Sequence, residues 1–229
     1  MYEIYYKEWD TINFGFKVGS VIIENLEFFS IETLKKQAKD YGFKLIYLQS
    51  PVELEYASLF YDEKIVYSKQ NKVKKTISHY SEITSYDLDI ITDELYKLSI
   101  LSGEYSRYNL DENFPKEKFI LLYNKWIENS ILSNYATDVI VYKIKNEIVG
   151  LLTYKNQNDI SNIGIIAVNP SFQGYGIGSK LLNYYQNQLD DNITELEVVT
   201  QGVNNKARAF YEKNGYKLKS KIYIYHLWL

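Results

Sequence analysis

The chain of 229 residues contains no cysteine, no sustained basic block and no long apolar run. Without cysteine it can form no disulfide bond and has no thiolate nucleophile. The net charge is −3, and we interpret the lysine cluster Lys69–Lys75 as a solvated loop or strand edge, so we expect no nucleic-acid partner. No segment approaches the ~20 apolar residues of a membrane-spanning helix, and Met1–Asp10 has no signal-peptide core. These absences predict a cytoplasmic protein without a membrane span.

Hydrophobic residues make up 46% of the chain, which is enough for real cores in one large domain or two small ones. In the first part, apolar periodicity predicts a β-α-β-α-β order. The expected elements are a strand over 2–6, a helix over 28–41, a strand over 45–48, a helix over 51–60 with Pro51 in its first turn, and a strand over 64–68. This order predicts a small α/β unit over residues 1–76, which closes in the polar, lysine-rich stretch near Lys75.

The second part, residues 77–229, has a different element order. Two helices come first, then three strands, and then helices and strands alternate to the end of the chain. The expected elements are helices over 87–102 and 115–132, a hairpin of strands 139–144 and 148–154, a strand over 161–168, a helix ending near 188, a strand over 196–200, a helix over 205–213 and a strand over 222–229. We expect that the apolar final strand could pair with a second copy of the chain.

A glycine-rich loop follows the expected strand 161–168 and opens a helix. Gly174, Gly176 and Gly178 let the backbone turn tightly, so that successive N–H groups at a helix start can point at one anion. The spacing does not fit a Walker loop, because Ser179 comes before the lysine and no hydroxyl is placed for magnesium. It also departs from the Rossmann G-x-G-x-x-G, although Glu197 lies at about the right distance downstream. The pattern therefore predicts a pyrophosphate cradle, with a simple connecting loop as the alternative.

The loop does match Gln-x-x-Gly-x-Gly at Gln173, Gly176 and Gly178, after Ala167-Val-Asn-Pro170. This resembles motif A of the GCN5-related N-acetyltransferase (GNAT) superfamily, which wraps the loop around the pyrophosphate of acetyl-CoA. The resemblance implies an α/β (α+β) fold with a mixed central sheet, and acetyl-CoA as the cosubstrate. The cofactor-binding residues that it implies on this stretch are Ile166, Val168, Gln173, Gly174, Gly176, Ile177, Gly178 and Ser179.

A second motif spans Asn204–Tyr216. Asn204 is a credible N-cap and Gly215 a credible terminator, so one interpretation is simply a capped amphipathic helix. The segment also resembles the superfamily pattern Asn-x-x-Ala-x-x-x-Tyr-x-x-x-Gly-Tyr/Phe. That resemblance implies that Asn204 contacts the pantetheine arm and that Tyr211 lies beside the thioester sulfur.

The chemistry of acetyl transfer assigns further roles. A primary amine attacks the thioester, and the oxyanion needs a donor, most simply a backbone N–H near Val168 on the motif strand. The thiolate that leaves needs a proton, for which Tyr211 is the candidate catalytic acid; the alternative is that Tyr211 only packs. Glu104 is a candidate base for the amine, although an isolated glutamate is usually just solvated. No metal ion is expected.

A narrower resemblance comes from the segments Trp9–Phe16, Ser106–Phe119 and Leu122–Ser130. They are similar to the dTDP-fucosamine acetyltransferase family, although Thr11 and Asn13 depart from its Trp-Asp-Ser-x-Phe-Phe-Gly pattern. The resemblance implies an N-terminal α/β unit ahead of the GNAT domain and a homodimer. It also implies acetylation of the 4-amino group of dTDP-4-amino-4,6-dideoxygalactose for a surface glycan, with Tyr211 as the proton donor.

Three residues of these segments are candidates for the acceptor site. The guanidinium of Arg107 suits bidentate binding of a phosphate, or it staples a loop by binding backbone carbonyls. Trp9 and Phe14 either stack on a base or sugar or fill the core between the two parts. The acceptor could instead be a peptide N-terminus, a lysine, a polyamine or an antibiotic amine. An acyl-CoA-binding module without turnover is a further alternative, against which the retained Tyr211 argues.

Overall fold

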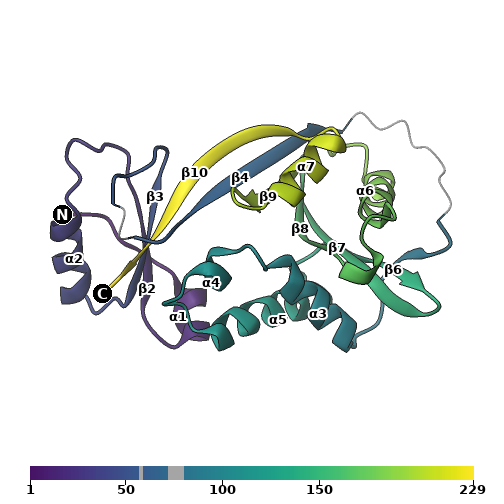
Figure 1. Ribbon diagram of the computed structural model, residues 1–229, viewed down its shortest axis with the longest axis horizontal. Helices are drawn as coiled ribbons and strands as arrows, with labels where there is room; N and C mark the ends of the chain where they lie inside the picture. The colour runs from purple at the N-terminus through teal and green to yellow at the C-terminus, as the bar shows by residue number, and fades with distance from the viewer. Residues whose placement is uncertain (57–58, 72–79) are drawn as a thin grey trace.

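The computed structural model describes residues 1–56, 59–71 and 80–229. These residues form one mixed sheet of ten strands in the order β1-β2-β3-β10-β4-β9-β8-β7-β6-β5 (Figure 1). The strands are β1 (Tyr5–Tyr6), β2 (Val18–Ile22), β3 (Leu45–Ser50), β4 (Tyr61–Gln70), β5 (Ile83–Ser85), β6 (Asp138–Ile144), β7 (Glu147–Gln157), β8 (Ile160–Val168), β9 (Glu195–Gln201) and β10 (Lys217–Trp228). Neighbours are antiparallel except β2 with β3 and β8 with β9. The expected α/β fold with a mixed sheet is confirmed.

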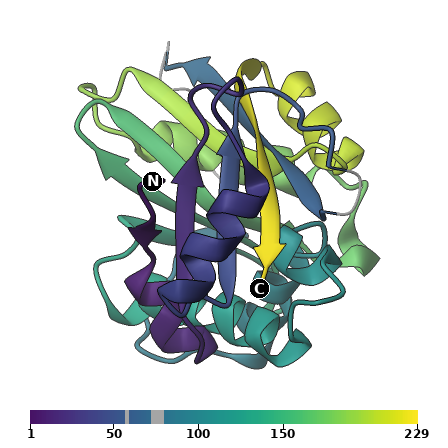
Figure 2. The ribbon, with the colours of Figure 1, turned by 90° about the vertical axis from the view of Figure 1, so that its left-hand side faces the viewer.

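Helices cover both faces of this sheet. The helices are α1 (Glu8–Phe14), α2 (Ile31–Asp40), α3 (Asp93–Ser102), α4 (Arg107–Leu110), α5 (Lys116–Leu132), α6 (Ile177–Gln188) and α7 (Asn205–Lys213), with a 3-10 turn η1 at Pro170–Phe172. On one face, α6 and α7 pack over the strands at one end and α2 over β2, β3 and β10 at the other (Figures 1 and 2). The remaining four helices lie on the opposite face. No helix among the described residues is long and apolar enough to cross a membrane.

Local sequence explains where α2 and α7 begin. Ser30 precedes α2, and its hydroxyl accepts a hydrogen bond from the backbone N–H of Thr33 at 3.3 Å. Asn204 caps α7 in the same way, because its Oδ1 accepts the N–H of Ala207 at 3.0 Å. Such caps satisfy N–H groups that the helix itself leaves unpaired. Asn204 therefore has the capping role that the sequence predicts.

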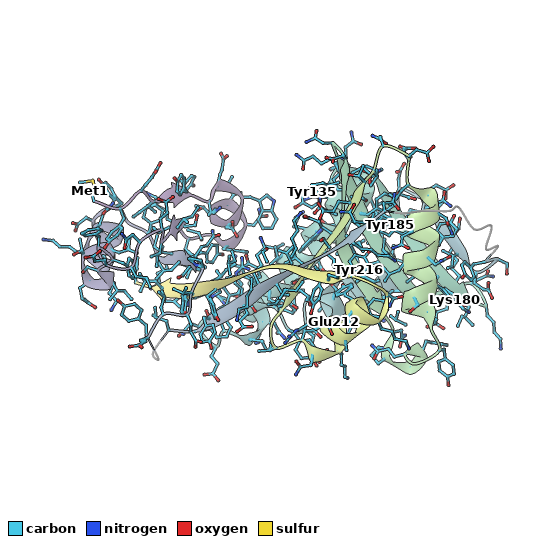
Figure 3. The ribbon with its side chains drawn as sticks, turned by 90° about the horizontal axis from the view of Figure 1, so that it is seen from above. Met1, Tyr135, Lys180, Tyr185, Glu212 and Tyr216 are labelled. Atoms are coloured by element: carbon cyan, nitrogen blue, oxygen red, sulfur yellow. The ribbon has the colours of Figure 1, made fainter. Side chains whose placement is uncertain are left out.

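Two long strands tie the first 70 residues to the rest of the chain. Strand β10 pairs with β3 on one side and with β4 on the other, and β4 pairs with β9. Figure 3 shows these strands running the length of the molecule, with Met1 at one end and Lys180 toward the other. The apolar end of β10 is thus paired inside the sheet, so the expected pairing of this strand with a second copy is wrong. The dimer stays a prediction.

The predicted division at residue 76 also stays a prediction. The boundary near Lys75 falls within 72–79, outside the described residues. The sheet itself does not divide there, because β4, from the first part, lies between β9 and β10 of the second. Phe14 is 1% exposed and contacts Phe114 edge-on with ring centroids 5.0 Å apart. It therefore fills the core between the two parts, while Trp9 lies half exposed against it.

Most predicted elements of the second part are confirmed, although β5 and α4 were missed there and helix 87–102 begins only at Asp93. A helix that was predicted wrongly lies in the first part. Residues 51–56 and 59–60 contain no helix, and 57–58 are not described. Instead, the hydroxyl of Ser50 bonds the carbonyl of Val52 at 2.6 Å, a local side-chain turn that competes with a helix. The short elements α1, β2 and α4 were not predicted, and helix 28–41 begins only at Ile31.

Candidate active site

An opening in the sheet lies between β8 and β9. The two strands pair in parallel from Ile160 to Ile163 and then separate. On the other side of β8, the register with β7 shifts after Tyr154, which marks a β-bulge. The bulge leaves the N–H of Ile165 without a ladder partner, and the Thr153 hydroxyl accepts it at 2.9 Å. Bulges bend a strand and are common beside active sites, and here the bend accompanies the separation of β8 from β9.

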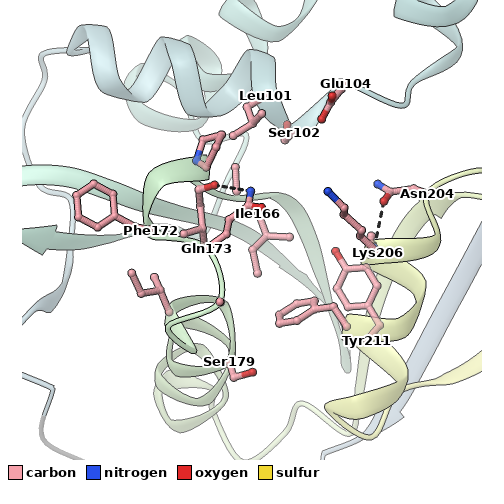
Figure 4. A pocket seen from close by; sticks show the side chains of 18 of the residues that line it. Leu101, Ser102, Glu104, Ile166, Phe172, Gln173, Ser179, Asn204, Lys206 and Tyr211 are labelled. Carbon is pink, nitrogen blue, oxygen red and sulfur yellow. Dashed lines mark hydrogen bonds between the residues drawn. The ribbon is translucent and has the colours of Figure 1, made fainter.

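The separation exposes backbone groups of β8. The N–H of Asn169 donates to the carbonyl of Val149 on β7 at 2.8 Å. Because successive residues of a strand present their backbone groups to opposite edges, the N–H groups of Val168 and Ile166 point toward the open side. The carbonyl of Val168 accepts a hydrogen bond from Nε2 of Gln173 at 3.0 Å (Figure 4). The expected donor near Val168 is therefore positioned at the opening.

The three loop positions require glycine for two different structural reasons. Gly174 and Gly176 adopt φ angles of +84° and +78°, which L side chains rarely adopt, and a Cβ at either would meet nothing within 4 Å. Gly178 has no positive φ, but a Cβ there would lie 3.1 Å from the ring of Phe210 on α7. The first two glycines therefore form an open concave turn, and the third lets α6 approach α7 closely.

A cavity of about 670 Å³ lies over this loop, between α3, α6 and α7 (Figure 4). All ten residues predicted to bind the cofactor line it: Ile166, Val168, Gln173, Gly174, Gly176, Ile177, Gly178, Ser179, Asn204 and Tyr211. Lys206 and Lys213 of α7 also line it, and they supply cations that the sequence analysis missed. Open backbone turns, exposed N–H groups and two lysines suit a phosphate-bearing ligand, so the residues fit acetyl-CoA.

Tyr211 stands at the inner end of this cavity and is 4% exposed. Its ring lies 6.0 Å from that of Tyr67 and 5.8 Å from that of Tyr216. Burial, with a smaller contribution from Tyr216, raises the pKa of Tyr211 well above its ordinary value. The phenol consequently stays protonated at neutral pH, the state that a proton donor needs.

A second cavity of about 520 Å³ lies on the other side of the opening. It shares five lining residues with the first: Ser102, Ile166, Asn204, Ala207 and Tyr211. Tyr123 and Trp126 of α5 form one wall as a stacked pair with centroids 5.8 Å apart. A Cβ on Gly164 would come within 2.9 Å of the Thr153 hydroxyl, so glycine at this position lets that hydroxyl lie close to β8. The two cavities therefore meet at Tyr211.

The second cavity is lined mainly by aromatic and aliphatic side chains with polar groups among them, and it carries little charge. Its lining residues include serine, threonine, asparagine and glutamine side chains, but no carboxylate or histidine among the described residues. Lys155 is the one cation of the lining, and its Nζ donates to the carbonyl of Asn134 at 2.7 Å. Burial raises the pKa of Tyr123 and of Tyr154 to about 12. The cavity thus combines apolar walls with scattered hydroxyl and amide groups and little charge.

The candidate base Glu104 and the candidate phosphate-binding residue Arg107 are placed differently. Glu104 follows α3 and lines the rim of the first cavity with its side chain exposed. Arg107 lines neither cavity. Its guanidinium carbon lies 4.3 Å from the ring centroid of Tyr108 and 5.1 Å from that of Tyr47, and it bonds no backbone carbonyl among the described residues. The structure therefore gives no support to the backbone-staple alternative for Arg107.

Sequence reasoning missed the whole second cavity. In the sequence, Tyr123 and Trp126 are three residues apart in the predicted helix 115–132. Apolar residues at this spacing ordinarily form the face of a helix that packs into the core. Glycine at position 164, inside the strand 161–168, is a local signal of a bulge or a close approach. No group of three or more histidine, aspartate or glutamate side chains that could hold a metal ion occurs among the described residues.

Known proteins resemble this chain in sequence and in fold. SpsD, a spore coat polysaccharide biosynthesis protein of Bacillus subtilis, is 25% identical over 60% of this chain and 47% of its own length. The crystal structure of a functionally unknown protein from Staphylococcus epidermidis has a TM-score of 0.64 at 14% identity, covering 92% of this chain and 83% of the other. A GNAT-family protein from Novosphingobium aromaticivorans has a TM-score of 0.52 at 9% identity, covering 80% and 73%.

At these identities the structural likeness shows the fold alone, and this chain spans about half the length of the curated relatives that it matches. Residues 136–218 match the acetyltransferase (GNAT) domain, and this range holds β8, the glycine loop and α7. The chain therefore carries a GNAT acetyltransferase domain.

Proposed function

We propose that this protein is an N-acetyltransferase that moves the acetyl group of acetyl-CoA to a primary amine, and that the amine is the 4-amino group of a nucleotide-linked deoxyamino sugar. The observation that carries the proposal is the meeting of two cavities at Tyr211. One contains the glycine loop and two lysines, and the other has aromatic walls, scattered hydroxyl and amide groups and little charge. A thioester entering from one side and an amine from the other come together at the opening between β8 and β9.

The residues divide the reaction into three tasks. Acetyl-CoA supplies the acetyl group as a thioester. The N–H groups of Val168 and Ile166 donate to the carbonyl oxygen as it gains negative charge. The amine nitrogen attacks the thioester carbon, and the C–S bond then breaks as the phenol of Tyr211 gives its proton to the departing sulfur. The amine loses one proton to water, and a proton from water returns to the phenolate of Tyr211, so the net products are the amide and the CoA thiol. Desolvation raises the pKa of phenol and thiol alike, so burial keeps this proton transfer feasible.

The sugar acceptor rests on two supports. The acceptor-side cavity offers hydroxyl, amide and aromatic side chains, a typical lining for a carbohydrate, and it lacks the carboxylates that would attract a polyamine. The curated relative SpsD is described as a spore coat polysaccharide biosynthesis protein. We further propose that the reaction takes place in the cytoplasm.

The test is CoA release from acetyl-CoA, followed with a thiol reagent. Because the chain has no cysteine, the protein adds no background signal. The acceptors are a nucleotide-linked 4-amino sugar, the corresponding free amino sugar, a polyamine, an arylalkylamine and a peptide. The proposal expects turnover on the amino sugars and none on the polyamine or peptide. Turnover confined to the polyamine or the peptide would refute the sugar acceptor.

The alternative from another class is a binding module that holds acyl-CoA without turnover. A buried phenol where the two cavities meet speaks against it, because a packing residue there needs no hydroxyl. Tight acetyl-CoA binding with no CoA release on any acceptor would favour this alternative.

A further inference from the structure

Lys64 lies on the sheet directly beside the acceptor-side cavity. In the antiparallel pairing of β4 with β9, Lys64 is opposite Gln201 and Val66 is opposite Val199. Directly paired residues place their side chains on the same face of a sheet. Gln201 lines the cavity, and the neighbours Ile65 and Tyr67 pack into the core under α6 and α7. Because side chains alternate along a strand, Lys64 lies on the opposite face, which α4 and α5 cover, next to the cavity wall. The side chain is half buried and has no hydrogen-bond or ion-pair partner among the described residues.

Arg107 reaches the same region from the helices that cover this face. Gly103, four residues earlier, packs so tightly on Tyr123 of the cavity wall that a Cβ would come within 2.3 Å of its ring. This contact fixes the turn that leads into α4. Stacking on Tyr47 and Tyr108 then holds the guanidinium, while its Nε is buried without a partner. Burial, together with the Arg107 charge, lowers the pKa of Lys64.

Two carboxylates also face this pair of cations. Burial raises the pKa of Asp62 to about 6 and raises that of Asp10, with Arg107 opposing both shifts. Asp10 accepts a hydrogen bond from the Tyr47 hydroxyl at 3.3 Å, but no carboxylate among the described residues lies within 4.0 Å of a nitrogen of Arg107. Glu197 is the other acid near Lys64. A terminal N–H of Arg107 donates to the Tyr108 hydroxyl. The Nε of Arg107 and the ammonium of Lys64 have no partner among the described residues, so each cation keeps a donor for an anion.

We propose that Lys64 and Arg107 form an anion subsite that extends the acceptor cavity and binds the phosphates of a nucleotide-linked acceptor. The inference rests on the proposed function and specifies its acceptor. Lysine contributes a mobile point charge, and the planar guanidinium offers paired donors, the combination that suits phosphate oxygens. The sugar occupies the cavity beside Tyr211, while the phosphates lie past Gln201 toward β4. The subsite thereby selects nucleotide-linked sugars over free amino sugars.

The experiment compares Lys64→Gln with the wild type on a nucleotide-linked amino sugar and on the free sugar. Losing a charge-assisted hydrogen bond of this kind raises KM about tenfold for the nucleotide-linked acceptor. The expected result is that rise with kcat unchanged and no effect on the free sugar. Lys221→Gln is the matched control, because Lys221 lies on β10 facing the other side of the sheet and contacts Glu63 at 3.2 Å. Equal KM values for Lys64→Gln and the control would overturn the subsite.

A binding measurement keeps the inference separate from the acetyltransferase assignment. A nucleoside diphosphate without sugar is titrated into protein saturated with acetyl-CoA, so that the glycine loop is already filled. We expect Lys64→Gln to weaken this binding about tenfold and Asp62→Asn to strengthen it, because the second change removes a facing negative charge. If no amino sugar is acetylated but these opposite shifts occur, the proposed acceptor fails and the anion subsite stands. No binding, or binding that neither variant changes, overturns the subsite.

Discussion

Gly176 offers a direct test of the cofactor loop, because a substitution there strains the backbone without creating a steric clash. Its φ of +78° is the left-handed conformation, which costs an L residue about 1–2 kcal/mol. A Cβ would meet nothing within 4 Å, so Gly176→Ala introduces no clash and the strain is the whole direct cost. For a chain of this size that cost lowers Tm by about 2–8 °C.

The strain should also weaken the binding of acetyl-CoA. A loop that relaxes away from the left-handed conformation turns its N–H groups away from the phosphate position. Losing one such hydrogen bond to a charged group weakens acetyl-CoA binding about tenfold or more. The assay is isothermal titration of acetyl-CoA into the variant and the wild type, with thermal unfolding run in parallel.

Gly42 provides the matched control. Its φ is +73°, and a Cβ there would also meet nothing within 4 Å, but it follows α2 at the far end of the sheet. Gly42→Ala should lower Tm by a similar amount and leave acetyl-CoA affinity unchanged. If Gly176→Ala loses stability like the control but binds acetyl-CoA as the wild type does, the loop is not the phosphate cradle and the reasoning fails.

Three further predictions concern the capped helix, the cavity wall and the buried histidine. Asn204→Ala should cost about 1 kcal/mol by removing the cap, and Asn204→Asp should restore stability but not the KM for acetyl-CoA, as unfolding and kinetics would show. Gly103→Ala should cost about 1–3 kcal/mol through overpacking against Tyr123 and raise KM for the amine more than for acetyl-CoA. Burial lowers the pKa of His226 to about 4 despite its 2.6 Å contact with Asp111. As the pH falls, the unfolded state binds a proton at His226 before the folded state does. The free energy of unfolding should therefore fall by about 3 kcal/mol between pH 6.5 and 4. Urea titrations should show this pH dependence in the wild type and not in His226→Gln.

The sequence predicts best where one local pattern determines both structure and chemistry. The glycine loop and the segment from Asn204 to Tyr211 carry their turns, cap and spacing within a few residues, so their residues could be placed in one site before any coordinates. The second part of the chain has long periodic helices and strands for the same reason. Short elements such as α1 carry too few residues for a periodic signal.

The second cavity could not be predicted, because its walls come from segments far apart in the chain. From its position on α5 alone, Tyr123 is expected to be an ordinary core residue. It becomes part of the wall of the second cavity only because β8 and β9 separate beside it. The position of β10 shows the same limit. An apolar strand at the end of a chain favours an edge, but tertiary pairing with β3 and β4 places it inside the sheet.

The most direct test of the account is Tyr211→Phe, assayed for CoA release and for acetyl-CoA binding on the same preparation. The substitution removes one hydroxyl and keeps the ring contacts with Tyr67 and Tyr216, so folding and binding should be retained. The account predicts that kcat falls about 100-fold or more while acetyl-CoA affinity stays within about twofold. A variant that binds acetyl-CoA normally and turns over at the wild-type rate would contradict the role of Tyr211 as the proton donor.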